Sequence, residues 1–435
     1  MPASSHNLIL CIKAIFLRLL MSIGMKLHYL AKPKPPEPDF KLVIPSRLHP
    51  DGGSFEVVFY LPTSYFETPN DHRYPVVINF HGGGFTLGSG TDDARFAHAV
   101  VWGVNAIFVS VEYRLAPEYP FSVGIEDSAD AVIYLAAHSE ELRIDPQRIA
   151  LSGFSAGGNI TFAVPLLLHD LKIGAGKRII SPIRTNDCTS SLSNTTIAAI
   201  SPKPFLPVSN LLGSASSLSS IRKLAGLKLT QLEIAQSLPE FTLLGLISFY
   251  PPVDYRKSRK QRCDSNPMPA LNLPRILTDF FDQAYLQVED LDLADPYLSP
   301  AASSDANLKA AYPNDIILYT CQYDMLNAEG VAFGKRLASE PIGKTVHGGI
   351  IEGVPHAFDK KPNPISFPER ADRCYQEVCA ELRRIFELKS SDAGKKFLDL
   401  NESVYRLEER DAMICEVDKV ALNESGDWRI SHEVI

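Results

Sequence analysis

Residues 148–159 read RIALSGFSAGGN, and this stretch decides the predicted fold. The apolar residues before Gly153 are typical of a buried strand, and the residues from Gly157 onward favour a helix. Small residues on both sides of Ser155 let the chain make a sharp strand-to-helix turn that exposes a serine hydroxyl. A G-x-S-x-G pattern arises by chance in roughly one in ten chains of this length, so the flanking strand and helix carry the inference. The alternative is a glycine-rich turn that only begins a helix.

A second glycine-rich stretch, residues 81–85 with sequence HGGGF, follows another apolar run. Backbone without side chains at Gly83 and Gly84 can approach a substrate carbonyl closely, and its N–H groups remain free to hold an oxyanion. Together with the N–H of Ala156, the residue after Ser155, they predict an oxyanion hole. A phosphate-cradling or purely structural turn is the alternative, but no P-loop lysine follows.

A nucleophilic serine needs a base, and three of the eleven histidines follow Ser155 by enough sequence: His347, His356 and His432. His347 lies inside a predicted strand, and His432 lies in a polar tail. His356 follows residues 350–355, where an apolar strand breaks into a loop, and this is the position that the chemistry requires. We therefore predict His356 as the base, with a surface or core histidine as the alternative.

The base needs an orienting carboxylate, and two aspartates compete for this role. Asp324 follows the predicted strand 315–321 and precedes His356 by about 32 residues. Asp295 lies before that strand, whereas catalytic loops collect at the carboxyl ends of parallel strands. We therefore predict Asp324 as the acid and Asp295 as a structural turn residue.

The chain alternates between strands and helices from about residue 54. The predicted strands are 54–61, 75–80, 106–113, 148–152, 243–250 and 315–321, and the predicted helices are 123–138, 157–171, 329–337 and 369–388. This alternation predicts an α/β fold with a mainly parallel sheet that is covered on both sides.

Composition excludes several classes of function. The 435 residues are 45% hydrophobic, enough for one large core or two modest ones. The net charge of −8 argues against nucleic acid as a partner and favours a small, largely uncharged substrate. Seven scattered cysteines without C-x-x-C spacing indicate neither a metal site nor a disulfide framework, and they fit a reducing, cytoplasmic compartment.

Residues 1–53 form the first predicted unit, an N-terminal helical segment and linker. Residues 8–25 are strongly apolar, but Lys13 and Arg18 interrupt them and no A-x-A cleavage site follows. We expect a docked helix that covers the active-site mouth. The alternatives are a peripheral or single-pass membrane anchor, with residues 8–30 at the membrane, and a cleaved signal peptide.

Residues 54–389 form the predicted catalytic domain, interrupted by an irregular insertion at 174–239 that is rich in serine, proline and asparagine. This insertion is a flexible surface segment, sequence translated from an incompletely trimmed transcript, or a functional lid. Residues 390–435 are polar and acidic and are predicted to be a weakly ordered tail.

Several motifs together resemble the hormone-sensitive-lipase-like branch of the α/β-hydrolase family, and its fungal-type members in particular. They are His81–Gly84, Tyr113–Glu118, Gly153–Asn159, Asp324 with Glu329-Gly330, and His356 before Ala357-Phe358. The resemblance covers roughly residues 40–172 and 240–388. It implies a sheet of about eight strands, a helical cap, and carboxylesterase or lipase activity without a cofactor, usually on short to medium acyl chains. Phe154 departs from the pattern, because an acidic residue often precedes the nucleophile in this family.

The motifs predict a serine esterase that forms an acyl-enzyme on Ser155. A non-catalytic small-molecule receptor and an acyltransferase or lyase on the same scaffold are the rival interpretations. The natural substrate, the acyl-chain preference and the oligomeric state cannot be predicted from these residues, because the cap shapes the pocket.

Overall fold

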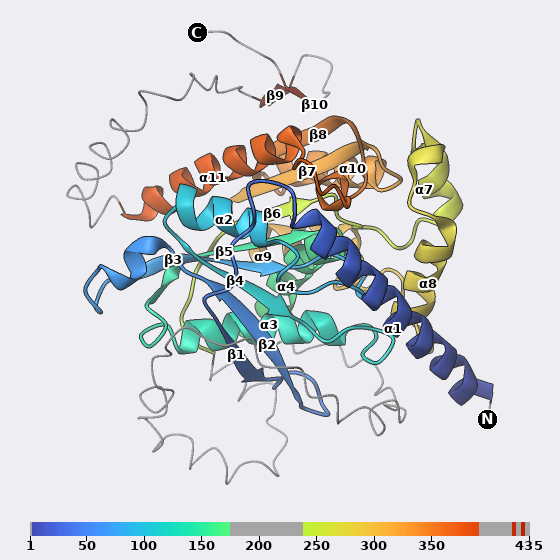
Figure 1. Ribbon diagram of the computed structural model, residues 1–435, viewed down its shortest axis with the longest axis horizontal. Helices are drawn as coiled ribbons and strands as arrows, with labels where there is room; N and C mark the ends of the chain where they lie inside the picture. The colour runs from blue at the N-terminus through green and yellow to red at the C-terminus, as the bar shows by residue number, and fades with distance from the viewer. Residues whose placement is uncertain (1, 175–237, 391–419, 423–427, 431–435) are drawn as a thin grey trace.

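An eight-stranded sheet forms the centre of the fold (Figure 1). The computed structural model describes residues 2–174, 238–390, 420–422 and 428–430. The strands of the sheet are β1 (Phe40–Pro45), β2 (Ser54–Tyr60), β3 (Tyr74–Phe80), β4 (Ile107–Glu112), β5 (Ile144–Phe154), β6 (Leu243–Phe249), β7 (Asp315–Tyr323) and β8 (Thr345–Pro355). Their order is β1-β2-β4-β3-β5-β6-β7-β8, and only β2 runs antiparallel to its neighbours. The predicted α/β fold with a mostly parallel sheet is confirmed.

The sheet extends further toward the start of the chain than the sequence indicated. Strand β1 pairs with β2 along its whole length, with Phe40 opposite Phe59. The rings of these two residues stack at 4.3 Å between centroids. Residues 40–45 therefore belong to the sheet, although they lie within the segment 1–53 that we expected to be cap and linker.

Helices cover both faces of the sheet (Figure 1). They are α2 (Ala94–Gly103), α3 (Val123–Ala137), α4 (Ala156–Lys172), α9 (Asp305–Ala311), α10 (Asn327–Ala338) and α11 (Glu369–Ser390). One apolar cluster joins α3, α4 and α10 to one face of the sheet, and a second joins α2 and α11 to the other. Every residue of β3 is buried, and its residues alternate between the two clusters, as expected for a central parallel strand.

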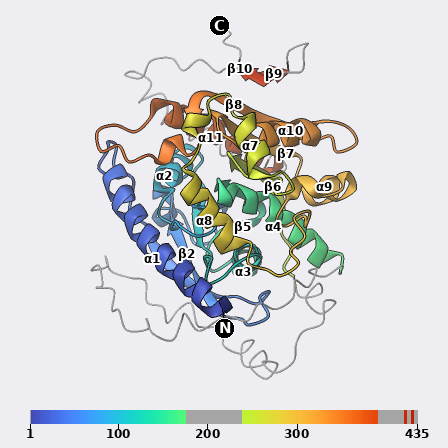
Figure 2. The ribbon, with the colours of Figure 1, turned by 90° about the vertical axis from the view of Figure 1, so that its right-hand side faces the viewer.

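Three further helices form a layer in front of this body (Figure 2). They are α1 (Pro2–His28), α7 (Arg259–Ser265) and α8 (Arg275–Tyr285). Short 3₁₀ turns complete the described elements: η1 (Thr63–Phe66), η3 (Pro269–Leu271), η4 (Pro300–Ala302) and η5 (Phe358–Lys360). The connection between β6 and β7 supplies α7 and α8, which together with α1 make up the cap.

The predicted insertion at 174–239 lies almost entirely outside the described residues, as does most of the predicted tail at 390–435. Two short strands of that tail, β9 (Val420–Leu422) and β10 (Trp428–Ile430), pair antiparallel with each other.

Candidate active site

Ser155 stands at the turn between β5 and α4. Its backbone has φ 53° and ψ −115°, a conformation that is uncommon for a residue with a Cβ and that concentrates at functional sites. The Ser155 N–H donates to the Phe249 carbonyl at 2.8 Å, which fixes the turn against β6. A Cβ on Gly157 would lie 1.8 Å from the carbonyl oxygen of Phe80, so only glycine fits there. The sharp turn predicted around Ser155 is present in the structure.

His356 follows the end of β8, and its Nε2 lies 2.8 Å from the Ser155 Oγ. The next residue, Ala357, has φ 51°, so the chain turns away directly after the imidazole and begins η5. The His356 side chain is almost fully buried and its ring packs edge-on against Tyr250 at 4.9 Å between centroids. Buried contacts thus hold the imidazole in one orientation toward Ser155.

Asp324 follows the end of β7 and lies behind the imidazole. Its Oδ2 is 2.6 Å from His356 Nδ1, and its Oδ1 accepts a hydrogen bond from the Leu326 N–H at 3.0 Å. Both carboxylate oxygens are thereby paired although the side chain is buried. The structure therefore brings Ser155, His356 and Asp324 together in one hydrogen-bonded chain.

The other candidates for the acid and the base, Asp295 and His347, make different contacts. The Asp295 carboxylate accepts from the Tyr297 N–H at 2.8 Å, within its own turn. His347 lies in β8, where its Nε2 faces Arg384 of α11 at 3.2 Å and Asp315 of β7 at 3.7 Å. His432 lies outside the described residues.

The predicted oxyanion residues Gly83 and Gly84 follow Gly82, on which a Cβ would lie 3.5 Å from the Ser155 Cβ, and Ala156 follows Ser155 directly. Gly83 has φ 117°, and a Cβ there would lie 2.2 Å from the Leu87 carbonyl oxygen. Among the described residues, the backbone N–H groups of Gly83, Gly84 and Ala156 have no hydrogen-bond partner. Ala156 is also the first residue of α4, so the positive end of the helix dipole adds to its N–H. These groups can bind developing negative charge.

The support beneath residues 81–85 was not predicted from the sequence. The His81 ring stacks on Tyr113 at 4.4 Å, and the Tyr113 hydroxyl donates to the His81 carbonyl at 2.8 Å. The pKa of Tyr113 is raised well above its ordinary value because the residue is fully buried. Tyr113 is the first residue of the Tyr113–Glu118 motif that contributed to the family resemblance. Its place in that motif was the sequence feature from which this support of His81 could have been predicted.

A buried polar cluster beside the site was also missed. The Asp359 carboxylate accepts from the hydroxyls of Tyr250 at 2.5 Å and Tyr375 at 2.7 Å. Lys360 Nζ lies 2.6 Å from Asp93 Oδ1 and 3.4 Å from Asp359 Oδ2. Burial alone would lower the pKa of Lys360, but the carboxylates of Asp93 and Asp359 outweigh burial and raise that pKa. The cluster fixes the segment that carries His356, because Asp359 and Lys360 follow it by three and four residues.

Phe154 has a role in the same cluster. Its ring stacks on Phe249 at 4.4 Å, and Lys360 Nζ lies 4.1 Å from its centroid. A cation over an aromatic face is stabilising, more so where it is desolvated. The position before Ser155, for which the resemblance implies an acidic residue, is occupied by an aromatic ring under a lysine.

Through α8, the cap reaches the loop of residues 81–85, which we call the oxyanion loop. The Phe281 ring lies where a Cβ on Gly84 would be, with its Cδ2 2.4 Å from that position. The neighbouring Phe85 stacks on Tyr285 at 3.8 Å between centroids. Aromatic rings of the cap therefore lie beside the place where an oxyanion would form.

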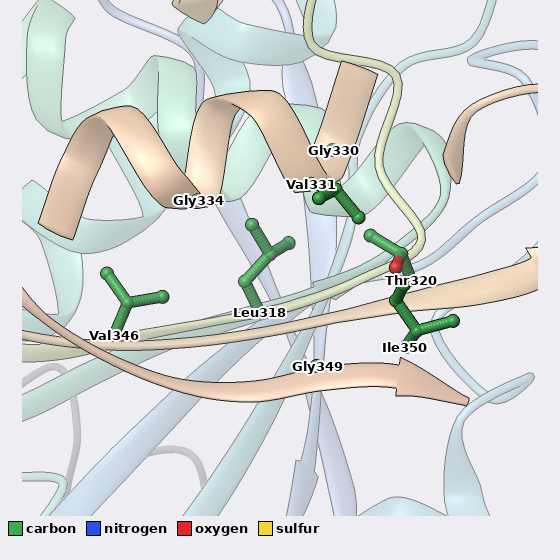
Figure 3. Close-up of a pocket in the computed structure, with 8 residues that line it drawn as sticks. All are labelled: Leu318, Thr320, Gly330, Val331, Gly334, Val346, Gly349 and Ile350. Carbon is green, nitrogen blue, oxygen red and sulfur yellow. The ribbon is translucent and has the colours of Figure 1, made fainter. Parts of the chain in front are cut away.

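A small apolar cleft lies under α10, between that helix and strands β7 and β8 (Figure 3). Leu318, Thr320, Val331, Val346 and Ile350 are among its lining residues. None of the lining residues belongs to the Ser155 site, so the cleft is not its substrate pocket. Among the described residues, no group of three or more His, Cys, Asp or Glu is placed to hold a metal ion.

Comparison with known proteins gives the family. The profile of a family described as alpha/beta hydrolase fold (Abhydrolase_3) matches residues 77–218 and 225–360, more than half of the chain. Carboxylesterase NlhH of Mycobacterium tuberculosis is 48% identical over 99 residues, which cover 22% of this chain and 30% of the relative. Lipase 2 of Moraxella sp. is 28% identical over 309 residues, covering 71% of this chain and 60% of the relative. The chain thus spans about a third to three fifths of the length of these curated relatives.

Solved structures agree in fold. The esterase of Pyrobaculum calidifontis superposes with a TM-score of 0.58 at 20% sequence identity, over 86% of this chain and 93% of that one. The matched profile, the eight-stranded sheet and the arrangement around Ser155 lead to one assignment. The chain belongs to the α/β-hydrolase fold family, in its hormone-sensitive-lipase-like branch.

Proposed function

We propose that this protein hydrolyses carboxylic esters through an acyl-enzyme on Ser155. The observation that carries the proposal is the hydrogen-bonded chain from Ser155 Oγ to His356 Nε2 at 2.8 Å and from His356 Nδ1 to Asp324 Oδ2 at 2.6 Å. The names of the relatives, which include carboxylesterases and lipases, support the same class of reaction.

In the first step, Ser155 Oγ attacks the ester carbonyl while His356 Nε2 takes its proton. Asp324 holds Nδ1 and stabilises the imidazolium that forms. The N–H groups of Gly83, Gly84 and Ala156 hold the oxyanion, a contribution for which each donor is typically worth on the order of a hundredfold in rate. His356 then gives the proton to the departing alcohol, and the acyl group stays on Ser155.

In the second step, water takes the place of the alcohol. His356 removes a proton from the water as it attacks the acyl carbonyl, and returns the proton to Ser155 Oγ as the carboxylic acid leaves. An added alcohol can compete with water at this step, so the partition between acid and new ester separates a hydrolase from an acyltransferase.

Hydrolysis of p-nitrophenyl acyl esters of graded chain length tests the proposal. Ser155→Ala should lower kcat by at least on the order of 10⁴-fold, because the nucleophile is lost. Ser54→Ala, at an exposed position on β2, is the matched control and should leave kcat unchanged. Wild-type rates in Ser155→Ala, or a wild-type protein inactive on every ester, would contradict the proposal.

A further inference from the structure

Helix α1 carries apolar side chains on two opposite faces. The inner face packs on the body: Leu10 and Ala14 are fully buried, and Met25 is nearly so. The outer face is a continuous stripe of large apolar residues that are between 44% and 59% exposed among the described residues. This outer face consists of Leu8, Ile9, Ile12, Ile15, Phe16, Leu19, Leu20, Ile23 and Leu27. Such a concentration of exposed apolar side chains marks an interaction surface.

The inner face is held by specific polar contacts. Arg18 makes a two-pronged ion pair with Glu118, with N–O distances of 2.9 and 2.8 Å. It also donates to the carbonyls of Thr86 at 2.9 Å and Ala116 at 2.8 Å. At the end of the helix, Arg95 of α2 donates to the His28 carbonyl at 3.1 Å. These contacts fix α1 lengthwise on the body, so its outer face points away from it.

Charge distinguishes between the occupants that this face could accept. Residues 1–36 contain five basic residues and no acidic one, although the whole chain has a net charge of −8. Lys13 and Lys26 are exposed on α1 itself, and Lys32 and Lys34 are exposed just beyond it. A basic border around an apolar helix face matches an anionic lipid surface, which attracts lysines and accepts apolar side chains.

We propose that the outer face of α1 is a membrane-docking surface that lies in the plane of an anionic lipid bilayer. The stretch Asn7–His28 is long and apolar enough to cross a membrane by length and composition. Crossing, however, would pull Leu10, Met25 and Arg18 away from the body and leave Glu118 without its partner. Lying in the plane buries the outer face and keeps every inner contact.

Docking in this way brings the bilayer close to the candidate active site. Thr86, which accepts from Arg18, follows the glycines of the oxyanion loop by two residues. The bilayer then lies about one helix diameter, roughly 10 Å, from that loop. An apolar ester dissolved in the lipid would have a short path to Ser155.

Co-sedimentation of the full chain with lipid vesicles tests the proposal without any measurement of activity. The wild type should bind vesicles of mixed phosphatidylcholine and phosphatidylglycerol more tightly than vesicles of phosphatidylcholine alone. Phe16→Glu and Ile12→Glu should each weaken binding on the order of tenfold, because a charge replaces an inserted apolar group. Lys13→Gln should weaken binding to the anionic vesicles by about fivefold and leave the neutral ones unchanged.

Phe66→Glu is the matched control, because Phe66 in η1 is 69% exposed against 58% for Phe16 and lies far from α1 in the sequence. It should bind vesicles as the wild type does. Far-UV circular dichroism and thermal midpoints of all variants establish that each is folded.

Three results would overturn the proposal. The first is a wild type that binds neither kind of vesicle. The second is a wild type that is dimeric without lipid and becomes monomeric as Phe16→Glu, which assigns the face to a second copy of the chain. The third is protein that stays with the vesicles after an alkaline carbonate wash, which indicates a spanning helix.

Discussion

Asp324 and Asp295 are both buried and both precede His356 in the sequence, and their hydrogen-bond partners distinguish them. Asp324 faces the imidazole, whereas the Asp295 carboxylate accepts from the backbone of its own turn. If Asp324 is the acid that we propose, Asp324→Asn should lower kcat on the order of 10⁴-fold with little change in KM, as the same change does in a Ser-His-Asp triad. Asp295→Asn, which keeps the turn's acceptor, should retain kcat within a few-fold. Steady-state kinetics on one ester decide between them, and the reverse pattern would give the acid role to Asp295.

The Tyr250 ring packs edge-on against the His356 imidazole, with 4.9 Å between centroids, and we infer that it positions this imidazole. Tyr250→Phe keeps the ring against the imidazole but removes the hydroxyl that donates to Asp359. We expect kcat to fall on the order of tenfold with KM unchanged, because the Asp359 carboxylate, three residues after His356, loses a buried hydrogen-bond donor.

Tyr312→Phe is the control for that variant. The Tyr312 hydroxyl is also buried and donates to the Phe162 carbonyl at 3.0 Å, away from His356. Both variants should lose about 1–3 kcal/mol of unfolding free energy, and kcat should change in Tyr250→Phe alone. An equal fall in kcat in both variants would show that Tyr250 has only a structural role.

At the scale of elements, a buried ion pair joins the cap to the β7–α10 corner. Arg262 Nε of α7 lies 2.9 Å from Glu329 Oε2, and Glu329 Oε1 accepts from the Val253 N–H at 2.9 Å. Glu329→Ala leaves Arg262 buried without a counter-charge, and should cost about 3–5 kcal/mol. Lys260→Ala removes half of an exposed pair on the same helix and should leave stability unchanged. Equal urea midpoints for the two variants would contradict this account.

The junction between α1 and the body predicts a dependence of stability on pH. Burial, followed by the nearby charges of Lys360 and Arg95, lowers the pKa of His28 to about 4. The unfolded chain takes up this proton near pH 6.5 and the folded chain only near pH 4, so the contribution is complete above about pH 6.5 and lost as pH falls toward 4. His28→Gln should therefore flatten the fall of urea-unfolding stability between pH 6.5 and 4. An unchanged slope would show that His28 is not the titrating group.

The elements that carry local signals were predictable from the sequence. The turn at Ser155, the end of β7 before Asp324 and the end of β8 before His356 are each marked by an apolar run that breaks into glycine or a loop. The Phe154–Lys360 contact and the Arg18–Glu118 ion pair join residues far apart in the sequence, so no local pattern marks them. The location of α1 was left open because both of its faces are apolar, and periodicity alone does not say which face packs inward.

At the scale of the whole molecule, sheet topology brings the candidate site together. Strands β3, β5, β7 and β8 are parallel, so the segments after their carboxyl ends meet at one edge of the sheet. They supply Gly83 with Gly84, Ser155, Asp324 and His356, in that order. The cap covers this edge through α8, and α1 closes it on one side with its apolar outer face exposed (Figure 2).

The central claim is that Ser155 is a nucleophile activated by His356. The most direct test is intact-mass analysis of the full chain after treatment with a fluorophosphonate, followed by peptide mapping. We predict one adduct per chain, located on the peptide that contains Ser155, with loss of labelling in Ser155→Ala and strong slowing in His356→Ala. A folded wild type that stays unlabelled, or an adduct on another residue, would contradict the account.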